Sequence, residues 1–373
     1  MISKLKIENF KCFSSPTEIE LSGLTACVGM NSMGKSSFIQ ALLLLRQAYE
    51  VITKFRGTRR KSFEIFLNDR YALQLGTFDQ VMSSTDADSI IIQADDVVFN
   101  LKQSSSNQSL TFQINEKLET IESNMSIFSS DFYYLNAERI GPRNYQAMES
   151  NSQLNCGFFG EQTYFFLSQN NSMTISSKRC FPNDEGKNVK KLDKQLEYWL
   201  NFIVPGVEIH ISEDSSMRLS QVKIGQPQFD TGLQSPYNFG FGISYVLPII
   251  ATGLAATNGS MVIFENPEAH LHPAGQSRIG QFLACIANDG LQVVVETHSE
   301  HVINGIRLYS LKNNMDPKSI CINYFNYSEG SKEYRIKRIK LNEQMKILEW
   351  PDGFFDQEEK DLKELRLTRG RQQ

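Results

Sequence analysis

The chain of 373 residues carries a formal net charge of −4, with 40% hydrophobic and 21% charged residues. This length predicts two or three domains around a substantial core, and the composition is typical of a soluble globular protein. The negative balance excludes a protein that coats nucleic acid with its whole surface, but it is compatible with a local basic patch.

Cysteine spacing and apolar runs indicate the compartment. The six cysteines are scattered without a C-x-x-C pair, which argues against a disulfide framework or zinc site and is typical of a reducing cytoplasm. The longest apolar run, residues 243–256, contains Pro248 and Gly253 and is shorter than a membrane span. Residues 1–6 lead into a strand pattern rather than a secretory signal. We therefore expect a cytoplasmic protein without a membrane partner.

The first half of the chain predicts strands around one long helix, followed by an antiparallel β region. No heptad repeat, the mark of a coiled coil, is present. Residues 144–195 show no sustained periodicity. The predicted elements, in order, are strands near 5–10, 19–21 and 24–28, a helix at 37–50, short strands between 71 and 114, a strand from 133 that ends in a turn by 143, and an amphipathic helix at 194–204.

Residues 29–36 match the phosphate-binding pattern G-x-x-x-x-G-K-[ST]. They lie between a predicted strand and a predicted helix, so backbone N–H groups and a helix N-terminus face an anion. Lys35 supplies charge to the outer phosphates, and the Ser36 hydroxyl can bind Mg²⁺. We expect ATP to contact Gly29, Met30, Asn31, Ser32, Met33, Gly34, Lys35, Ser36 and Ser37.

The second half changes to fully apolar strands. The apolar strand at 261–264 is followed by Glu265, and the strand at 292–295 is followed by Glu296. A predicted helix at 274–288 connects the two strands. This pattern predicts a parallel sheet that is covered on both faces. Glu265 is expected beside the phosphate loop, at the carboxyl edge of the sheet, as a Mg²⁺ ligand.

The wide separation of Glu265 from the phosphate loop predicts one composite domain. Residues 1–316 would form a nucleotide-binding head, with an insert of about 55–235 that contains β and helical subdomains. Residues 317–373 would form a small C-terminal domain, whose aromatic motif at 350–356 either packs on the head or docks a partner. The helix predicted at 357–369 would be a solvated surface helix.

A glycine-rich turn at 238–244 precedes a helical run and provides a second helix N-terminus suited to an anion. A single chain needs only one phosphate cradle, whereas a head-to-tail homodimer uses both, one from each subunit. His298 follows the strand that ends in Glu296, where it could reach a γ-phosphate.

These motifs occur in an order that resembles the ABC-type ATPase heads of SMC, RecF and OLD-like proteins. More specifically, the chain resembles bacterial AAA-type ATPases that end in a small domain of unknown function, through residues 135–139, 265–273, 296–299 and 350–356. The resemblance implies an α/β P-loop NTPase fold of the ABC-ATPase-head type, with a mixed central sheet, an antiparallel β subdomain, a helical insert and no long coiled coil.

The resemblance also assigns site residues. Gln80 would be the glutamine that senses metal and water, with Gln74 nearly as plausible. The residues that would touch the γ-phosphate bound by the partner subunit are Asn238, Gly240, Gly242 and Ser244.

The sequence departs from the usual ABC pattern at Asn266, which stands where a catalytic glutamate normally follows the metal-binding acid. Asparagine cannot accept a proton, so the general base lies elsewhere or hydrolysis is slow. Glu268 is the nearest replacement, and His298 would polarise the γ-phosphate. The expected catalytic set is therefore Glu268, His298, Lys35 and Glu265, with Ser36, Glu265 and Gln80 at the metal.

Three other functions compete with a dimeric ATPase. A nucleotide-gated sensor or clamp would bind ATP without turnover. A small-molecule kinase would use Arg139 and Arg143 in a lid. A metallohydrolase would use the pairs His270–His272 and His298–His301 as ligands.

The biological setting is expected from the resemblance and from charge. Related ATPases act in DNA repair or anti-phage defence with an effector such as a nuclease, and this chain contains no recognisable nuclease acid cluster. The basic run 54–61 is either a DNA or RNA backbone contact or a solvated loop.

Overall fold

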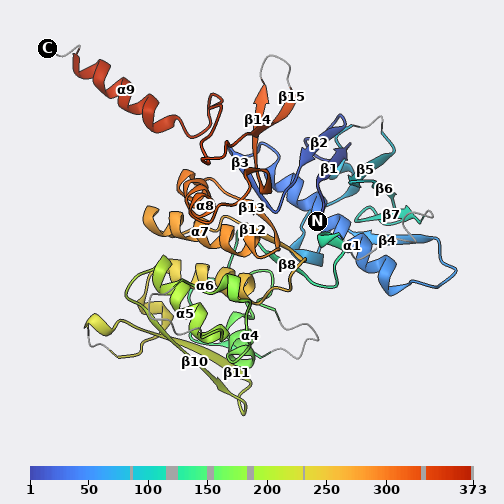
Figure 1. Ribbon diagram of the computed structural model, residues 1–373. Coiled ribbons are helices and arrows are strands. Elements are labelled where there is room, and N and C mark those ends of the chain that lie inside the picture. The colour runs from blue at the N-terminus through green and yellow to red at the C-terminus, as the bar shows by residue number, and fades with distance from the viewer. Residues whose placement is uncertain are drawn as a thin grey trace.

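The computed structural model describes residues 1–84, 87–114, 125–148, 155–182, 189–229, 232–328 and 333–370 (Figure 1). Two six-stranded sheets share the long helix α1 (Lys35–Lys54). A layer of helices covers the other side of the central sheet, and a helical insert with a three-stranded sheet packs on that layer. In these segments no helix is long and apolar enough to cross a membrane.

The central sheet is parallel except at one edge. Strands β14, β3, β13, β12 and β8 run in the same direction, and only β15 is antiparallel to its neighbour. This agrees with the parallel sheet expected from the apolar strands. In spatial order the strands are β15 (Glu333–Ile339), β14 (Ile320–Ser328), β3 (Leu24–Gly29), β13 (Gln292–Glu296), β12 (Met261–Glu265) and β8 (Phe132–Leu135).

Alternate side chains of the central strands point into two separate cores, as the period of a strand requires. Val262 and Phe264 of β12 pack with α6 (Phe241–Ala255), α7 (Pro273–Asn288) and α8 (Glu300–Lys312). Met261 and Ile263 of the same strand pack with α1 and the antiparallel sheet. Because both faces are buried, the strand consists of apolar residues throughout.

The antiparallel β region confirms the reading of residues 71–114 and extends it to the N-terminal strands and β4. Its strands bury one face against α1, whose leucine run lies in the same core. A single-turn helix, α2 (Phe78–Val81), lies beside it. In spatial order the strands are β2 (Thr17–Glu20), β1 (Lys4–Glu8), β5 (Ser89–Ala94), β6 (Val97–Gln103), β7 (Ser109–Gln113) and β4 (Ser62–Phe66).

The helical insert confirms the amphipathic helix predicted at 194–204. It also contains α4 (Thr163–Asn170), which the weak periodicity of residues 144–195 does not reveal. The remaining elements of the insert are α5 (Leu192–Ile203) and the strands β10 (Glu208–Asp214), β11 (Leu219–Gly225) and β9 (Gln146–Ala147).

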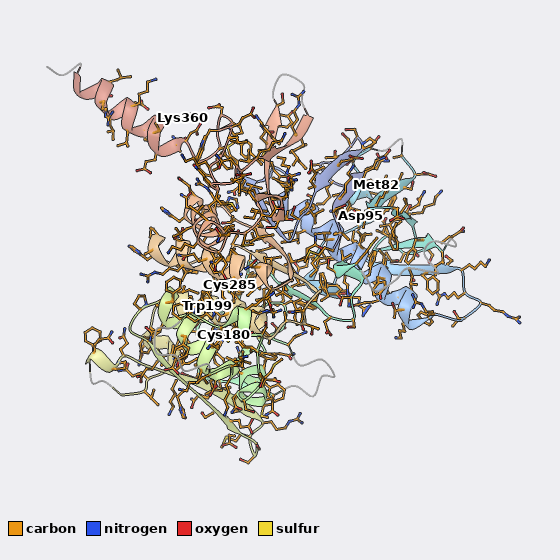
Figure 2. The ribbon with its side chains drawn as sticks, viewed as in Figure 1. Met82, Asp95, Cys180, Trp199, Cys285 and Lys360 are labelled. Carbon is orange, nitrogen blue, oxygen red and sulfur yellow. The ribbon has the colours of Figure 1, made fainter. Side chains whose placement is uncertain are left out.

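Arg179 fastens this insert to the head. Its guanidinium forms a buried ion pair with Asp289 at 2.8 Å, and it donates hydrogen bonds to three backbone carbonyls at the end of α6. The Arg179 carbonyl accepts a hydrogen bond from the Trp199 indole, which packs on Phe282 of α7. Cys180, Trp199 and Cys285 mark this junction in Figure 2.

The C-terminal segment adds to the central sheet before it leaves the head. Strand β14 pairs along the whole of β3, so the predicted boundary near residue 316 precedes a strand of the main sheet. Phe354 is buried against Tyr324, as expected if the aromatic motif packs on the head. Trp350 of the same motif is exposed. Helix α9 (Gln357–Gly370) projects away from the body (Figure 1). The division into two domains stays a prediction.

Candidate functional site

The phosphate loop joins β3 to α1 with a conformation that depends on glycine. Gly34 precedes the helix at φ 98°, and a Cβ there would stand 2.7 Å from the Cys12 sulfur. The Lys35 ammonium donates to the carbonyls of Gly29 and Met30, at 3.0 and 2.7 Å. The Lys35 ammonium therefore lies inside the phosphate loop. A bound phosphate would replace the two carbonyls as its hydrogen-bond partner.

Glu265 ends β12 and is held by groups that arrive from β8. The Tyr134 hydroxyl donates to its carboxylate at 2.8 Å. The buried Arg139 guanidinium donates to the backbone carbonyls of Glu265 and Asn266, at 2.6 and 2.7 Å. These two residues fix the acidic end of the strand, a role that their sequence positions alone do not indicate.

Glu296 is the candidate site residue that sequence reasoning passed over. It ends β13, which lies between the phosphate-loop strand and β12. The Ser36 hydroxyl donates to both of its carboxylate oxygens, at 3.3 and 3.2 Å, and the Lys35 ammonium lies 4.0 Å away. The signal was present, because Glu296 follows an apolar strand in the same way as Glu265.

Glu268 and His298 face each other across the ends of β12 and β13. The His298 backbone N–H donates to the Glu268 carboxylate at 2.8 Å, which leaves the second carboxylate oxygen buried without a hydrogen bond. Partial desolvation at the cavity wall, together with the Lys35 ammonium, lowers the pKa of His298. A neutral imidazole at this position can donate an N–H to a phosphate oxygen.

One cavity of about 530 Å³ brings eight of the predicted site residues together, while Glu268 lines another cavity that His298 also borders. Residues that the sequence did not predict, Lys11 and Cys12, form part of its wall, and Lys11 is held by Gln40 at 2.7 Å. The predicted residues that line the cavity are Asn31, Ser32, Gly34, Lys35, Ser36, Ser37, Glu265 and His298, and Asn266 and Glu296 lie among them.

The chemistry of this cavity fits a triphosphate with a divalent cation. Hard cations such as Mg²⁺ prefer one or two carboxylates and a hydroxyl, with phosphate oxygens completing the shell. Ser36, Glu265 and Glu296 supply such oxygens. Within the described segments, four buried side-chain polar atoms lack a hydrogen bond, and three of them belong to Arg139, Asn266 and Glu268. Of these three residues Asn266 lines this cavity, and a buried polar atom without a partner at a cavity is typical of a group that binds water or ligand.

The glycine-rich turn lies at a different place. Gly240 caps α6 at its exposed N-terminus, and Gly242 packs so closely on the His270 carbonyl that a Cβ would stand 2.8 Å from it. Both glycines line a second cavity of about 490 Å³ rather than the phosphate-loop cavity. Asn238 is exposed and Ser244 half-buried in the same region. One chain therefore presents the two predicted phosphate cradles separately.

Gln80 is not brought to the cavity. Its side chain accepts a hydrogen bond from the Thr77 backbone N–H at 2.9 Å and caps α2. Gln74 forms an isolated antiparallel β-bridge with Asn68, and it does not line the cavity either. The local demand for a helix cap explains where Gln80 points, and a metal role for either glutamine stays a prediction.

The residues of the rival functions lie apart. His270 packs against the rings of Phe241 and Tyr245. His272 caps α7 by accepting a hydrogen bond from the Ala274 backbone N–H. In the described part of the chain, no three His, Cys, Asp or Glu side chains are grouped to hold a metal ion. This gives the zinc interpretation no support. Of the two arginines that a kinase lid would use, Arg139 binds the backbone carbonyls at the end of β12, and Arg143 is exposed.

The basic run 54–61 forms an exposed loop between α1 and β4. Arg60 lies over the rings of Phe55 and Phe63, at 5.5 and 5.4 Å from their centroids. Arg60, one of the cations of the basic run, is therefore part of an aromatic cluster at the edge of the antiparallel sheet.

One buried and two half-buried acids, Glu296, Glu265 and Glu268, make the stability of the protein depend on pH. Burial raises the pKa of Glu265 and Glu268, and burial together with Glu265 raises the pKa of Glu296 to about 7. The folded chain thus binds more protons than the unfolded chain between about pH 4.5 and 7. Stability conferred by these protons is complete below this window and is lost as the pH rises through it.

We therefore expect the free energy of unfolding, measured without nucleotide in EDTA, to fall between pH 5.5 and pH 8. Glu296 alone would contribute on the order of 2 kcal/mol to this fall. Urea unfolding at the two pH values measures it, and Glu296→Gln should show a smaller fall. An identical fall in the variant would contradict the assignment.

Comparisons with protein families divide the chain into three matching parts. Residues 1–178 match the model of an AAA ATPase domain. Residues 200–304 match that of an AAA domain described as a putative AbiEii toxin of a Type IV toxin–antitoxin system. Residues 315–365 match a family of proteins of unknown function, DUF3696. None of the curated proteins matches the sequence at a significant level.

Solved structures show the fold. An SMC head bound to the C-winged helix domain of ScpA is 12% identical, with a TM-score of 0.54 over 92% of this chain and 99% of that chain. An SMC head domain from Thermotoga maritima is 12% identical, with a TM-score of 0.45 over 91% of this chain and 99% of that chain. The first similarity shows that the chain has the fold of an SMC head domain.

Proposed function

From the premise that this chain is an ABC-type ATPase head of the SMC and RecF-like group that ends in a DUF3696 segment, we propose that it works as an ATP-gated homodimer. ATP would bind at the phosphate loop, and two heads would close head to tail over two ATP molecules. Slow hydrolysis would reopen them. A partner protein would respond to the change.

The observation that carries this proposal is the separation of two phosphate cradles in one chain. The phosphate loop and the acids line one cavity, whereas Gly240 and Gly242 line another. Exposed apolar side chains flank the glycine-rich turn, which supports a protein contact there, because large apolar residues gather on surfaces that bind other proteins. They are Phe229, Leu233, Tyr237 and Phe241.

The chemistry follows from the residues around the phosphate-loop cavity. Lys35 and the loop N–H groups would hold the outer phosphates, and Ser36 and Glu265 would hold Mg²⁺, which neutralises phosphate charge when bound. Glu268, whose second carboxylate oxygen has no hydrogen-bond partner, would accept a proton from water. His298 would donate to the γ-phosphate. Asn266 supports slow turnover, because it cannot replace the usual base.

A clamp that binds ATP without turnover is the second candidate, and Asn266 is the observation that favours it. Both candidates require ATP-dependent dimers. Phosphate release by the purified protein separates them: release above the rate of a Lys35→Ala variant supports an enzyme, and none supports the clamp.

The test of dimerisation is mass photometry in ATP, ADP and buffer. We expect dimers in ATP only. Lys35→Ala should remain monomeric because it loses ATP, whereas Ser244→Arg should bind ATP but remain monomeric because the added side chain obstructs the partner's phosphate. Ser215→Arg, on an exposed turn, is the matched control and should dimerise. A parent protein that binds ATP and stays monomeric at all concentrations would refute the proposal.

The partner is proposed to be an effector such as a nuclease, in DNA repair or anti-phage defence. The solved SMC head in complex with a ScpA domain supports the idea that this fold binds other proteins. The exposed loop at 54–61 would make DNA the trigger. An ATPase rate that rises with DNA, and no longer rises in Arg59→Glu, would support this; a response unchanged in the variant would exclude the loop.

A further inference from the structure

Glu296 lies midway between the two halves of the nucleotide site. In the central sheet β13 is the neighbour of both β3 and β12. Glu296 is in register with Cys27, two residues before the phosphate loop begins, and with Glu265 on the other side. The carboxyl ends of parallel strands meet at one edge of a sheet. The two acids therefore stand side by side facing the phosphate loop.

The carboxylate of Glu296 is buried and has few partners. Its residue is only 5% exposed. In the described segments the Ser36 hydroxyl is the one side-chain donor within hydrogen-bond distance, and the Lys35 ammonium is 4.0 Å away. An ionised carboxylate offers about four acceptor sites. Glu296 therefore keeps acceptor capacity that faces the same cavity as Ser36 and Glu265.

Glu296, which is buried, and Glu265, which is half-buried, would together repel the phosphates of a nucleotide. Lys35 is the nearest cation to Glu296, but it also has to serve the phosphates. Like charges a few ångströms apart repel each other strongly inside a protein, where water screens them little. A divalent cation between the acids and the phosphates would remove this repulsion. The geometry thus gives Glu296 two effects: it positions Ser36, and it makes a metal necessary.

We propose that Glu296 is a second acidic residue of the cation site, acting beside Glu265 on Ser36 and the metal, so that triphosphate binding depends strongly on a divalent cation. This inference rests on the proposed binding of ATP at the phosphate loop. Glu296 is a positioning residue here, distinct from Glu268, and its effect is on binding rather than on proton transfer.

The test compares the affinity of a fluorescent mant-ATP in Mg²⁺ and in EDTA. We expect Glu296→Gln to weaken binding in Mg²⁺ by about tenfold, the lower end of what loss of a metal-site partner costs. In EDTA the same variant should bind more tightly than the parent, because one buried negative charge is gone. The ratio of the two affinities should therefore fall at least tenfold. Glu343→Gln, an exposed glutamate, should keep the parent ratio.

A second variant protects the test from misfolding. Glu296→Asp keeps the charge but shortens the reach to Ser36, so it should weaken binding in Mg²⁺ and leave binding in EDTA unchanged. A parent ratio retained in Glu296→Gln, or in Glu296→Asp if the first variant does not fold, would overturn the inference alone. A parent protein that fails to bind mant-ATP in Mg²⁺ would overturn the proposed function and this inference together.

Discussion

Glu268→Gln is expected to lower the rate of ATP hydrolysis by about 100-fold, the usual minimum contribution of a general base. Glu268 is oriented for this role because its carboxylate accepts the His298 backbone N–H at 2.8 Å and leaves its other oxygen buried and without a partner. Glutamine has nearly the same shape and can still accept that N–H, but it cannot take a proton from water. The variant should bind ATP normally.

The measurement is phosphate release under saturating ATP, together with mass photometry of the same samples. ATP-bound dimers should accumulate in Glu268→Gln, since closure no longer leads to hydrolysis. Glu343→Gln repeats the chemical change on an exposed side chain and should behave as the parent does. If Glu268→Gln releases phosphate as fast as the parent, Glu268 is not the base.

Arg179→Met is expected to destabilise the protein by about 3–5 kcal/mol, as removal of one partner from a buried ion pair does. Arg179 is 2% exposed, and it links Asp289 to the carbonyls that end α6. Methionine fills part of the volume but leaves Asp289 charged and buried and the carbonyls without donors. Each such buried group adds its own desolvation cost.

Urea and thermal unfolding measure this loss, which is large against a typical total stability of about 5–15 kcal/mol. Lys178→Met is the matched control, because Lys178 is the exposed neighbour of Arg179, and it should change stability by less than about 0.5 kcal/mol. Arg179→Met with Asp289→Leu should be more stable than Arg179→Met alone. A single variant as stable as the parent would show that this junction does not hold the insert to the head.

The sequence by itself was sufficient for features encoded over a few neighbouring residues. The phosphate loop, the helix that follows it and the apolar strands before Glu265 and Glu296 are local patterns, and the structure confirms each element. Their physical basis is periodicity: a strand buried on both faces must be apolar throughout, and a helix can face an anion only where a loop frees its first N–H groups.

Local rules also explain what sequence reading missed within elements. The stretch 144–195 hides α4 because polar residues interrupt its pattern, although Tyr164, Phe166 and Leu167 are buried. The resemblance assigns Gln80 to the metal, and in the structure its side chain caps α2, where it accepts a backbone N–H; the metal role stays a prediction. The cap is a local contact whose geometry only coordinates define.

Tertiary structure decided which distant residues meet. Glu296 and Ser36 are 260 positions apart, and their contact exists because β13 lies next to β3. The same order of strands brings β14 from the predicted C-terminal domain into the central sheet. A period of apolar residues shows that a strand is buried but does not name its neighbours. The sequence thus determined that this protein has a phosphate loop and acidic strand ends, whereas the sheet order alone decided that Glu296 is the acid that touches the loop.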